Sequence, residues 1–188
     1  YAEHLGRCAS SFDQIQNALK QPLRFTDHFL LPLLESKIRQ TTPKVLALSV
    51  PFPGNLYSAL RCAEWVKKNH PHIQVIMGGG FVNTELRSIN DCRFFKYIDY
   101  LLLDDGEITL YQLLQYLEGN ASIKDLVRTF YLEKESNQVR YQNNTSFSDY
   151  QQEELGAPDY SNFKLNQYLS IIEVMNPMHK LWSDGRWN

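Results

Sequence analysis

The stretch Val75-Ile76-Met77-Gly78-Gly79-Gly80-Phe81 is the most informative part of this chain, because an apolar run passes directly into three consecutive glycines. Residues 73–77 are apolar apart from Gln74 and rich in β-branched side chains, a pattern typical of a buried strand. Glycine permits positive φ and lets a ligand approach the backbone closely. In an open α/β sheet, ligands bind at the carboxyl edge, where these glycines would lie. The alternative is a tight turn that only reverses the chain.

Two further units of strand, loop and helix flank this stretch. Residues 45–50 form a near-continuous apolar strand, and residues 98–103 form a third strand before the acidic loop 104–107. Helical stripes of apolar residues follow at 56–66 and 110–117, and we expect a short helix over residues 84–90. Strand–helix units with short connections predict an α/β fold with a doubly wound parallel sheet, of the flavodoxin or Rossmann-like type.

The chain divides into four segments by pattern. Residues 1–43 are helical, and residues 44–122 form the α/β core. Residues 123–142 alternate around a polar turn, which predicts a β-hairpin. Residues 143–188 are a polar linker and an irregular apolar tail.

Composition excludes several classes of partner. A formal net charge of -2 provides no basic field for nucleic acid, and no apolar run approaches the length of a membrane span. The three cysteines lie far apart, which fits a reducing compartment better than a disulfide framework and supplies no Cys-x-x-Cys pair for a metal. We therefore expect a cytoplasmic protein. Because the chain opens at Tyr1 rather than Met, we interpret it as a fragment.

Three loops should share one sheet edge: Ser49-Val50-Pro51, Gly78-Gly79-Gly80 and Asp105-Gly106-Glu107. Their arrangement resembles the cobalamin-binding domain that precedes the barrel of many radical S-adenosylmethionine proteins. In that family a Ser-x-Leu element precedes a Gly-Gly pair at the spacing seen here, and a later Gly-Glu pair is typical of the radical subgroup. Residues 158–170 and 176–182 look like that subgroup's connector to its catalytic barrel.

The resemblance implies that the serine reaches the nucleotide tail of a corrinoid and that the glycines let this tail pass the backbone. The cofactor-binding residues that it implies are Ser49, Val50, Pro51, Gly78, Gly79, Gly80, Phe81, Asp105, Gly106 and Glu107. It implies no catalytic residue and no protein ligand to cobalt. The [4Fe-4S] cluster and S-adenosylmethionine would belong to a barrel absent from this chain. The expected partners are therefore the corrinoid and that barrel, and the parent protein would be a radical enzyme.

The chain also departs from the family. Pro51 replaces the leucine of the Ser-x-Leu element, and the cobalt-ligating Asp-x-His-x-x-Gly element has no match. His4-Leu5-Gly6 is only a fragment of it, and the strand before it would lie upstream of Tyr1. These departures motivate an alternative: a degenerate domain that binds no ligand and acts as a scaffold for the barrel.

Other interpretations concern single groups. The acidic residues 104, 105 and 107 suggest a metal cluster, but an N-capping Asp105 with Glu107 in the first helical turn is the simpler interpretation. A phosphoacceptor receiver domain is a third possibility, disfavoured because its acidic pair would follow the wrong strand. The hydroxyl of Ser49 could instead be satisfied by neighbouring backbone, and we expect His70 and His72 to be exposed at a turn.

Overall fold

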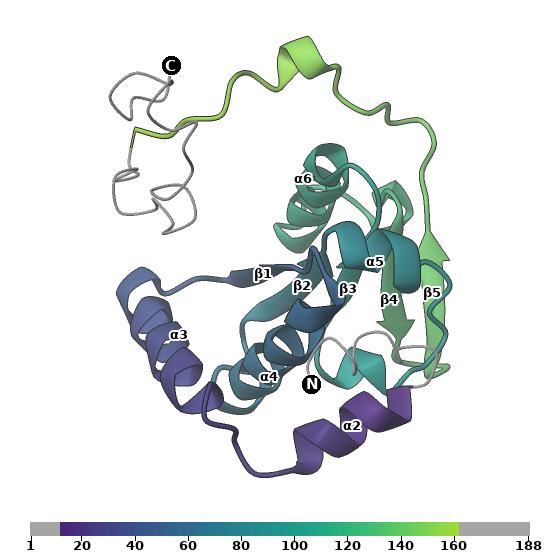
Figure 1. The fold of residues 1–188 in the computed structure, drawn as a ribbon. Coiled ribbons are helices and arrows are strands. Elements are labelled where there is room, and N and C mark those ends of the chain that lie inside the picture. Colours follow the sequence, from purple (N-terminus) through teal and green to yellow (C-terminus); the bar gives the residue numbers. More distant parts are fainter. Residues whose placement is uncertain (1–11, 162–188) are drawn as a thin grey trace, which may run out of the picture. The chain divides into compact units, whose positions relative to one another are not determined.

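Five strands form one mixed sheet whose order, β1-β2-β3-β4-β5, follows the order of the chain (Figure 1). The computed structural model describes residues 12–161. Strands β1, β2 and β3 are mutually parallel, whereas β4 is antiparallel to both β3 and β5. The strands span Val45–Ser49 (β1), Gln74–Gly78 (β2), Tyr100–Leu102 (β3), Thr129–Glu133 (β4) and Gln138–Gln142 (β5).

The expected hairpin is confirmed, but it extends the main sheet instead of standing apart. Leu102 of β3 pairs with Thr129 of β4, so β4 starts at the carboxyl edge and runs back. The chain reaches that edge because residues 118–128, with buried Leu126 and Val127, return along the sheet before β4 begins. The wholly parallel sheet that we expected is therefore corrected to a mixed one. The described strands also show no reversal of order, the feature that opens a ligand crevice in a doubly wound sheet.

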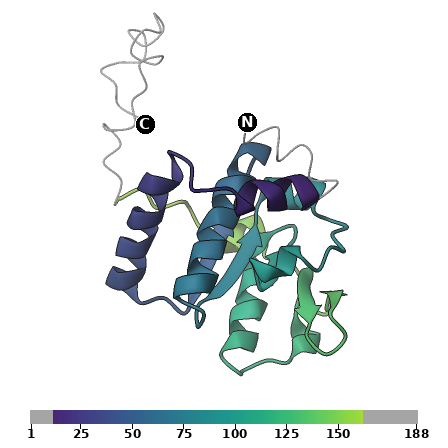
Figure 2. The same ribbon diagram turned by 90° about the horizontal axis from the view of Figure 1, so that it is seen from below.

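Helices cover both faces of the sheet. Strand β2 alternates between them: Val75 and Met77 join the core under α2, α3, α4 and α5, whereas Ile76 packs with Leu113 of α6 on the other face. Figure 2 shows α3 beside α4 in the larger layer, in agreement with their contacts. The helices span Phe12–Lys20 (α2), Asp27–Thr41 (α3), Pro53–Asn69 (α4), Gly80–Glu85 (α5) and Gly106–Leu117 (α6), with short 3₁₀ turns at Phe94–Lys96 (η1), Ile123–Asp125 (η2) and Gln152–Glu154 (η3).

Local sequence explains most helix positions. Helix α4 begins with a proline, whose missing N–H is not needed in the first turn, and buries Leu56, Leu60, Ala63 and Val66 on one stripe. Helix α5 differs from expectation. We expected a short helix over 84–90, but α5 begins at the third glycine, because Phe81 and Val82 are drawn into the core.

A buried polar cluster joins the amino-terminal helices to α4. The Arg61 guanidinium donates to the Leu19 carbonyl at the end of α2 (2.8 Å) and to the Tyr57 hydroxyl (2.9 Å). That hydroxyl donates in turn to Asp27 at the start of α3 (3.0 Å). Asp27 is 0% exposed and Arg61 4%. The expected helical segment is thus present over residues 12–41 and fixed to the sheet layer by charge as well as by apolar packing.

The structure divides into two units, with a boundary between Tyr150 and Gln151. The described part of the second unit contains only η3. The apolar tail and most of the connector that we expected, residues 162–188, lie outside the described residues. Among residues 12–161, no helix combines the length and the apolar composition that a membrane span needs.

Candidate functional site

A cavity of about 350 Å³ lies on the α6 face of the sheet and reaches the carboxyl ends of the parallel strands. Its floor is the row in which Ser49 of β1 pairs with Gly78 of β2, beside Leu102 of β3. The first residues of α6 form its wall. The lining residues are Ala47, Leu48, Ser49, Ile76, Gly78, Gly79, Leu102, Asp104, Gly106, Glu107 and Leu110.

The floor is hollow because its side chains are small. On β1 the residues that face α6 include Ala47 and Ser49, and the partner of Ser49 on β2 is Gly78. Ala47 and Ser49 are both exposed, although they lie in a sheet strand. The core of this face, around Ile76 and Leu113, is centred on β2 and β3 instead. The cavity therefore arises because α6 covers β2 and β3, whereas β1 carries small side chains on this face.

The structure brings together half of the residues implied by the resemblance: Ser49, Gly78, Gly79, Gly106 and Glu107 line this one cavity. Our expectation that the three loops share one sheet edge agrees with this, because the lining includes residues from all three. Pro51, Gly80 and Asp105 are exposed but lie outside the lining. Val50 and Phe81 are 0% and 2% exposed, so their side chains belong to the core rather than to a ligand surface.

The glycines of the run are needed for different physical reasons. A Cβ at Gly79, whose φ is +107°, would lie 2.8 Å from the Val50 nitrogen and 2.9 Å from its oxygen. A Cβ at Gly80 would lie 3.3 Å from the Pro51 oxygen. The two loops are also bonded, because Val50 N–H donates to the Gly78 carbonyl (2.8 Å) and Phe81 N–H to the Val50 carbonyl (3.0 Å). Gly79 is therefore required by the packing of the protein itself.

Gly106 is the opposite case. A Cβ at this position would meet no atom within 4 Å, and the residue opens α6 at the cavity wall. Packing among the described residues thus leaves the space beside the Gly106 backbone open. Asp105 occupies the N-cap position, as expected, but its side chain makes no capping hydrogen bond. Glu107 lies in the first turn of α6 and at the cavity wall.

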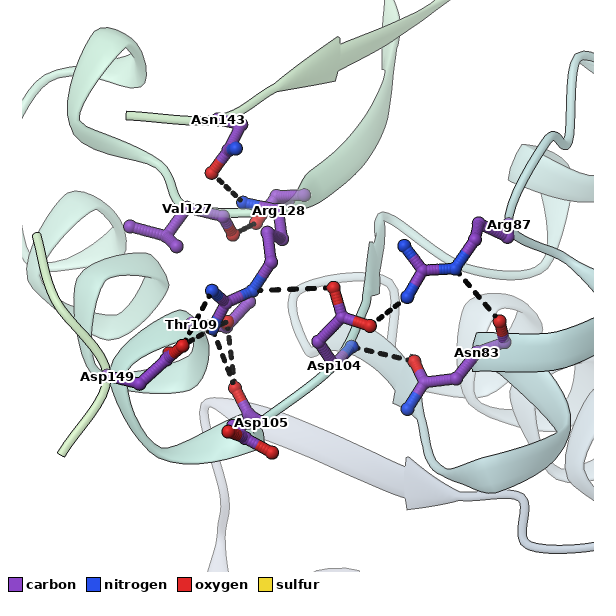
Figure 3. A network of polar contacts seen from close by, with 10 residues as sticks. Asn83, Arg87, Asp104, Asp105, Thr109, Val127, Arg128, Asn143 and Asp149 are labelled. Carbon is purple, nitrogen blue, oxygen red and sulfur yellow. Dashed lines mark hydrogen bonds and ion pairs between the residues drawn. The ribbon is translucent and has the colours of Figure 1, made fainter. Parts of the chain in front are cut away.

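A network of charged side chains lies beside this wall (Figure 3). Asp104 pairs with Arg87 of the segment after α5 and lies 3.8 Å from the Nε of Arg128. The Asp104 N–H donates to the Asn83 side chain (2.7 Å). Arg128 also forms an ion pair with Asp149, for which Nη1 lies 3.2 Å from Oδ2. These carboxylates raise the pKa of Arg128, chiefly through the hydrogen bond to Asp149.

We did not predict this network from the sequence. Asp104 and Arg128 are far apart in the chain, and only the antiparallel return of β4 brings them together. One local signal was visible, the acidic run after β3, but it suggested a metal cluster or a cap. Within residues 12–161, no group of three or more His, Cys, Asp or Glu side chains is arranged to hold a metal ion.

The remaining titratable groups of interest lie away from the cavity. His70, which we expected to be exposed, is half-buried, and its Nε2 lies 2.7 Å from Glu35 Oε2. This contact, together with Arg39, lowers the pKa of Glu35 to about 2. Burial raises the pKa of the Cys62 thiol to about 11, and nearby Asp27 adds to the effect.

We compared the chain with family models, curated proteins and solved structures, and none of the three comparisons gave a significant match. The function is therefore argued from the geometry of the site.

Proposed function

We propose that this chain is a cobalamin-binding module of a radical S-adenosylmethionine enzyme, which presents a corrinoid at the carboxyl edge of β1, β2 and β3 to an iron–sulfur barrel. One observation carries the proposal. Ser49, Gly78 and Gly106 come from three separate loops or strand ends, yet they line a single cavity beside the sheet. These are the positions at which the resemblance requires a hydroxyl and an uncovered backbone.

The chemistry of the cavity fits part of such a ligand. Its volume of about 350 Å³ lies at the lower end of the range for small-molecule sites, about 300–1,000 Å³. Apolar side chains such as Ile76, Leu102 and Leu110 dominate the walls, and the Ser49 hydroxyl supplies a hydrogen-bonding group. A whole cobalamin is larger than the cavity. The cavity is therefore suited to the nucleotide tail. The rest of the cobalamin would have to lie outside it, at the open carboxyl edge of the sheet.

Three residues have defined roles in this proposal. The Ser49 hydroxyl would hydrogen-bond the tail, Gly78 would leave room on the floor, and Gly106 would leave room at the wall. When bound, a corrinoid supplies a cobalt centre that carries a methyl group or takes part in a ring rearrangement. Reduction of S-adenosylmethionine by a [4Fe-4S] cluster would belong to the barrel, so this chain by itself would not be catalytic.

A second candidate is a scaffold that holds no ligand and supports the barrel. It is favoured by the contact between Gly79 and Val50, because the space beside this glycine is already filled by the Val50 backbone rather than left for a ligand. The network at Asp104 also occupies part of the same edge. The two candidates differ in one respect: only the first requires the space beside Gly106 to be filled by a cofactor.

Gly106→Leu tests this difference, because a Cβ at this position would meet no atom of the protein within 4 Å. The whole chain of 188 residues would be titrated with hydroxocobalamin, and binding followed by the corrinoid absorbance that co-elutes with the protein. We expect the wild type to retain the corrinoid and Gly106→Leu to bind at least about tenfold more weakly, a change of about 1.4 kcal/mol.

Tyr111→Leu is the matched control. It places the same side chain on α6 at an exposed position, 49% accessible, that does not line the cavity. We expect this variant to bind like the wild type, and both variants to unfold at the same urea concentration within error. Equal retention by the Gly106→Leu and Tyr111→Leu variants would contradict the proposed site. A wild-type chain that retains no corrinoid would favour the scaffold.

A further inference from the structure

The Arg128 side chain contacts both the cavity wall and a segment that is distant from this wall in the sequence. Its Nη2 donates to the Asp105 carbonyl and to the Thr109 hydroxyl, both at 3.4 Å, which holds the first turn of α6. The same guanidinium binds Asp149, near the end of the irregular segment 143–149. Figure 3 shows the Arg128 side chain between Asp149 on one side and Asp104 on the other.

The backbone at both ends of this contact is held in an unusual conformation. Asp104 has φ +60° and Arg128 φ +41°, in the left-handed region that residues with a side chain rarely adopt. The Leu103 N–H donates to the Arg128 carbonyl (3.0 Å), so the two turns are bonded to each other. Residues in such conformations persist only where surrounding contacts determine them. The side-chain network around Arg128 is one set of such contacts.

Arg128 is the cation that joins Asp149 to the acidic residues of the wall, whereas Asp104 also pairs with Arg87. Three carboxylates, Asp104, Asp105 and Asp149, raise the pKa of Arg128 through hydrogen bonding or coulombic attraction. Without the guanidinium, Asp149 would face acidic residues at the wall. Segment 143–149 is otherwise held at its start, where Asn143 Oδ1 accepts from the Arg128 N–H (3.2 Å) and the Asn144 N–H donates to the Leu126 carbonyl (2.9 Å).

We infer that Arg128 couples the cavity to segment 143–149: docking of Asp149 and the ordering of the α6 first turn assist one another through the shared guanidinium. Arg128 is a positioning residue in this scheme, since it does not line the cavity. Where a ligand occupies the cavity, coupling must be reciprocal, so the ligand tightens the docking of Asp149 by the same factor. This last statement rests on the proposed cobalamin function, whereas the coupling between wall and segment does not.

Hydrogen–deuterium exchange on the whole chain tests the coupling without a ligand. Asp149→Asn removes one charge from segment 143–149, and we expect amide exchange to accelerate about fivefold both there and at residues 104–110 of the wall. Glu133→Gln is the matched control, because it breaks a similar arginine–carboxylate pair with Arg140 on the hairpin. Faster exchange confined to residues 143–149 in the Asp149→Asn variant would overturn the inference.

A second arm adds hydroxocobalamin as the probe. In the wild type it should protect residues 143–149, and Asp149→Asn should abolish this protection and weaken binding by about fivefold. Arg128→Lys keeps the charge but loses the planar fork, so it should restore only part of the protection that Arg128→Gln loses. Binding of the probe with no protection of 143–149 would overturn the inference. If the probe does not bind but Asp149→Asn still accelerates exchange at the wall, the coupling stands and only the proposed function fails.

Discussion

Gly79 lies so close to Val50 that a Cβ atom on residue 79 would be 2.8 Å from the Val50 backbone nitrogen. The loop after β1 and the loop after β2 are therefore packed backbone against backbone at the carboxyl edge of the sheet. This contact places Ser49 and Gly78 side by side on the cavity floor. The glycine run thus shapes the site chiefly by joining two loops, and only secondarily by exposing its own backbone.

Substitution of Gly79 should therefore destabilise the fold. Its φ of +107° and ψ of 176° lie in a region that only glycine adopts readily, so Gly79→Ala should lower the free energy of unfolding by about 2–3 kcal/mol. Gly78→Ala is the control, since its Cβ would meet its nearest atom at an ordinary 3.5 Å, and should cost less than about 1 kcal/mol. Urea unfolding followed by circular dichroism measures both. Equal losses would contradict the packing described for Gly79.

The buried charged groups around Arg61 should stabilise the fold only as a complete set. Arg61→Met leaves Asp27 buried without its cation, and breaking a buried pair in this way costs about 3–5 kcal/mol. Arg39→Met breaks the exposed pair with Glu35 and should cost less than about 1 kcal/mol.

The double variant Asp27→Leu with Arg61→Met supplies the decisive comparison. Apolar replacement of both partners should recover part of the stability that Arg61→Met loses, because no unpaired charge remains. Thermal unfolding would compare the stabilities of Arg61→Met, Arg39→Met and the double variant. A double variant less stable than Arg61→Met alone would show that the cluster stabilises by shape rather than by charge.

Acid should destabilise the fold partly through Glu35. Its hydrogen bonds to His70 and Arg39 lower its pKa from 4.5 to about 2. A carboxyl whose pKa is lowered in the folded state stabilises that state above its unfolded pKa, and this stabilisation is lost as the pH falls from about 4.5 towards 2. Glu35→Gln should therefore flatten the stability profile below pH 4.5, as measured by urea unfolding at a series of pH values. Glu85→Gln, at an exposed position on α5, should leave the profile as steep as in the wild type.

The two described cysteines should differ in reactivity. Burial raises the pKa of Cys62 to about 11, so at pH 8 its thiolate is scarce as well as shielded. Cys92 is only partly buried and should be alkylated first by iodoacetamide. Peptide mapping by mass spectrometry separates the two positions, and alkylation of Cys62 should appear only when urea unfolds the chain. Labelling of Cys62 at the rate of Cys92 in the folded protein would contradict its burial.

The sequence by itself determined most local elements and the edge on which the loops meet. The β-branched apolar run that ends in Gly78 predicted a strand, and parallel strands joined through helices place the following loops on one edge. The polar turn at residues 135–137 likewise predicted the hairpin, because alternation and turn chemistry are both read within a few residues. Because loops that follow parallel strands share one edge, the sequence also predicted that Ser49, Gly78 and Gly106 lie together.

Tertiary structure alone decided how these parts combine. The antiparallel pairing of Leu102 with Thr129 depends on the path of residues 118–128, and no short pattern encodes that path. The reason for Gly79 is its contact with the Val50 backbone, which lies far from it in the chain. The pairing of Arg128 with Asp104 and Asp149 likewise joins residues that are distant in the chain. Such long-range contacts arise from the simultaneous packing of several elements, whereas a sequence pattern reports only the preferences of neighbouring residues.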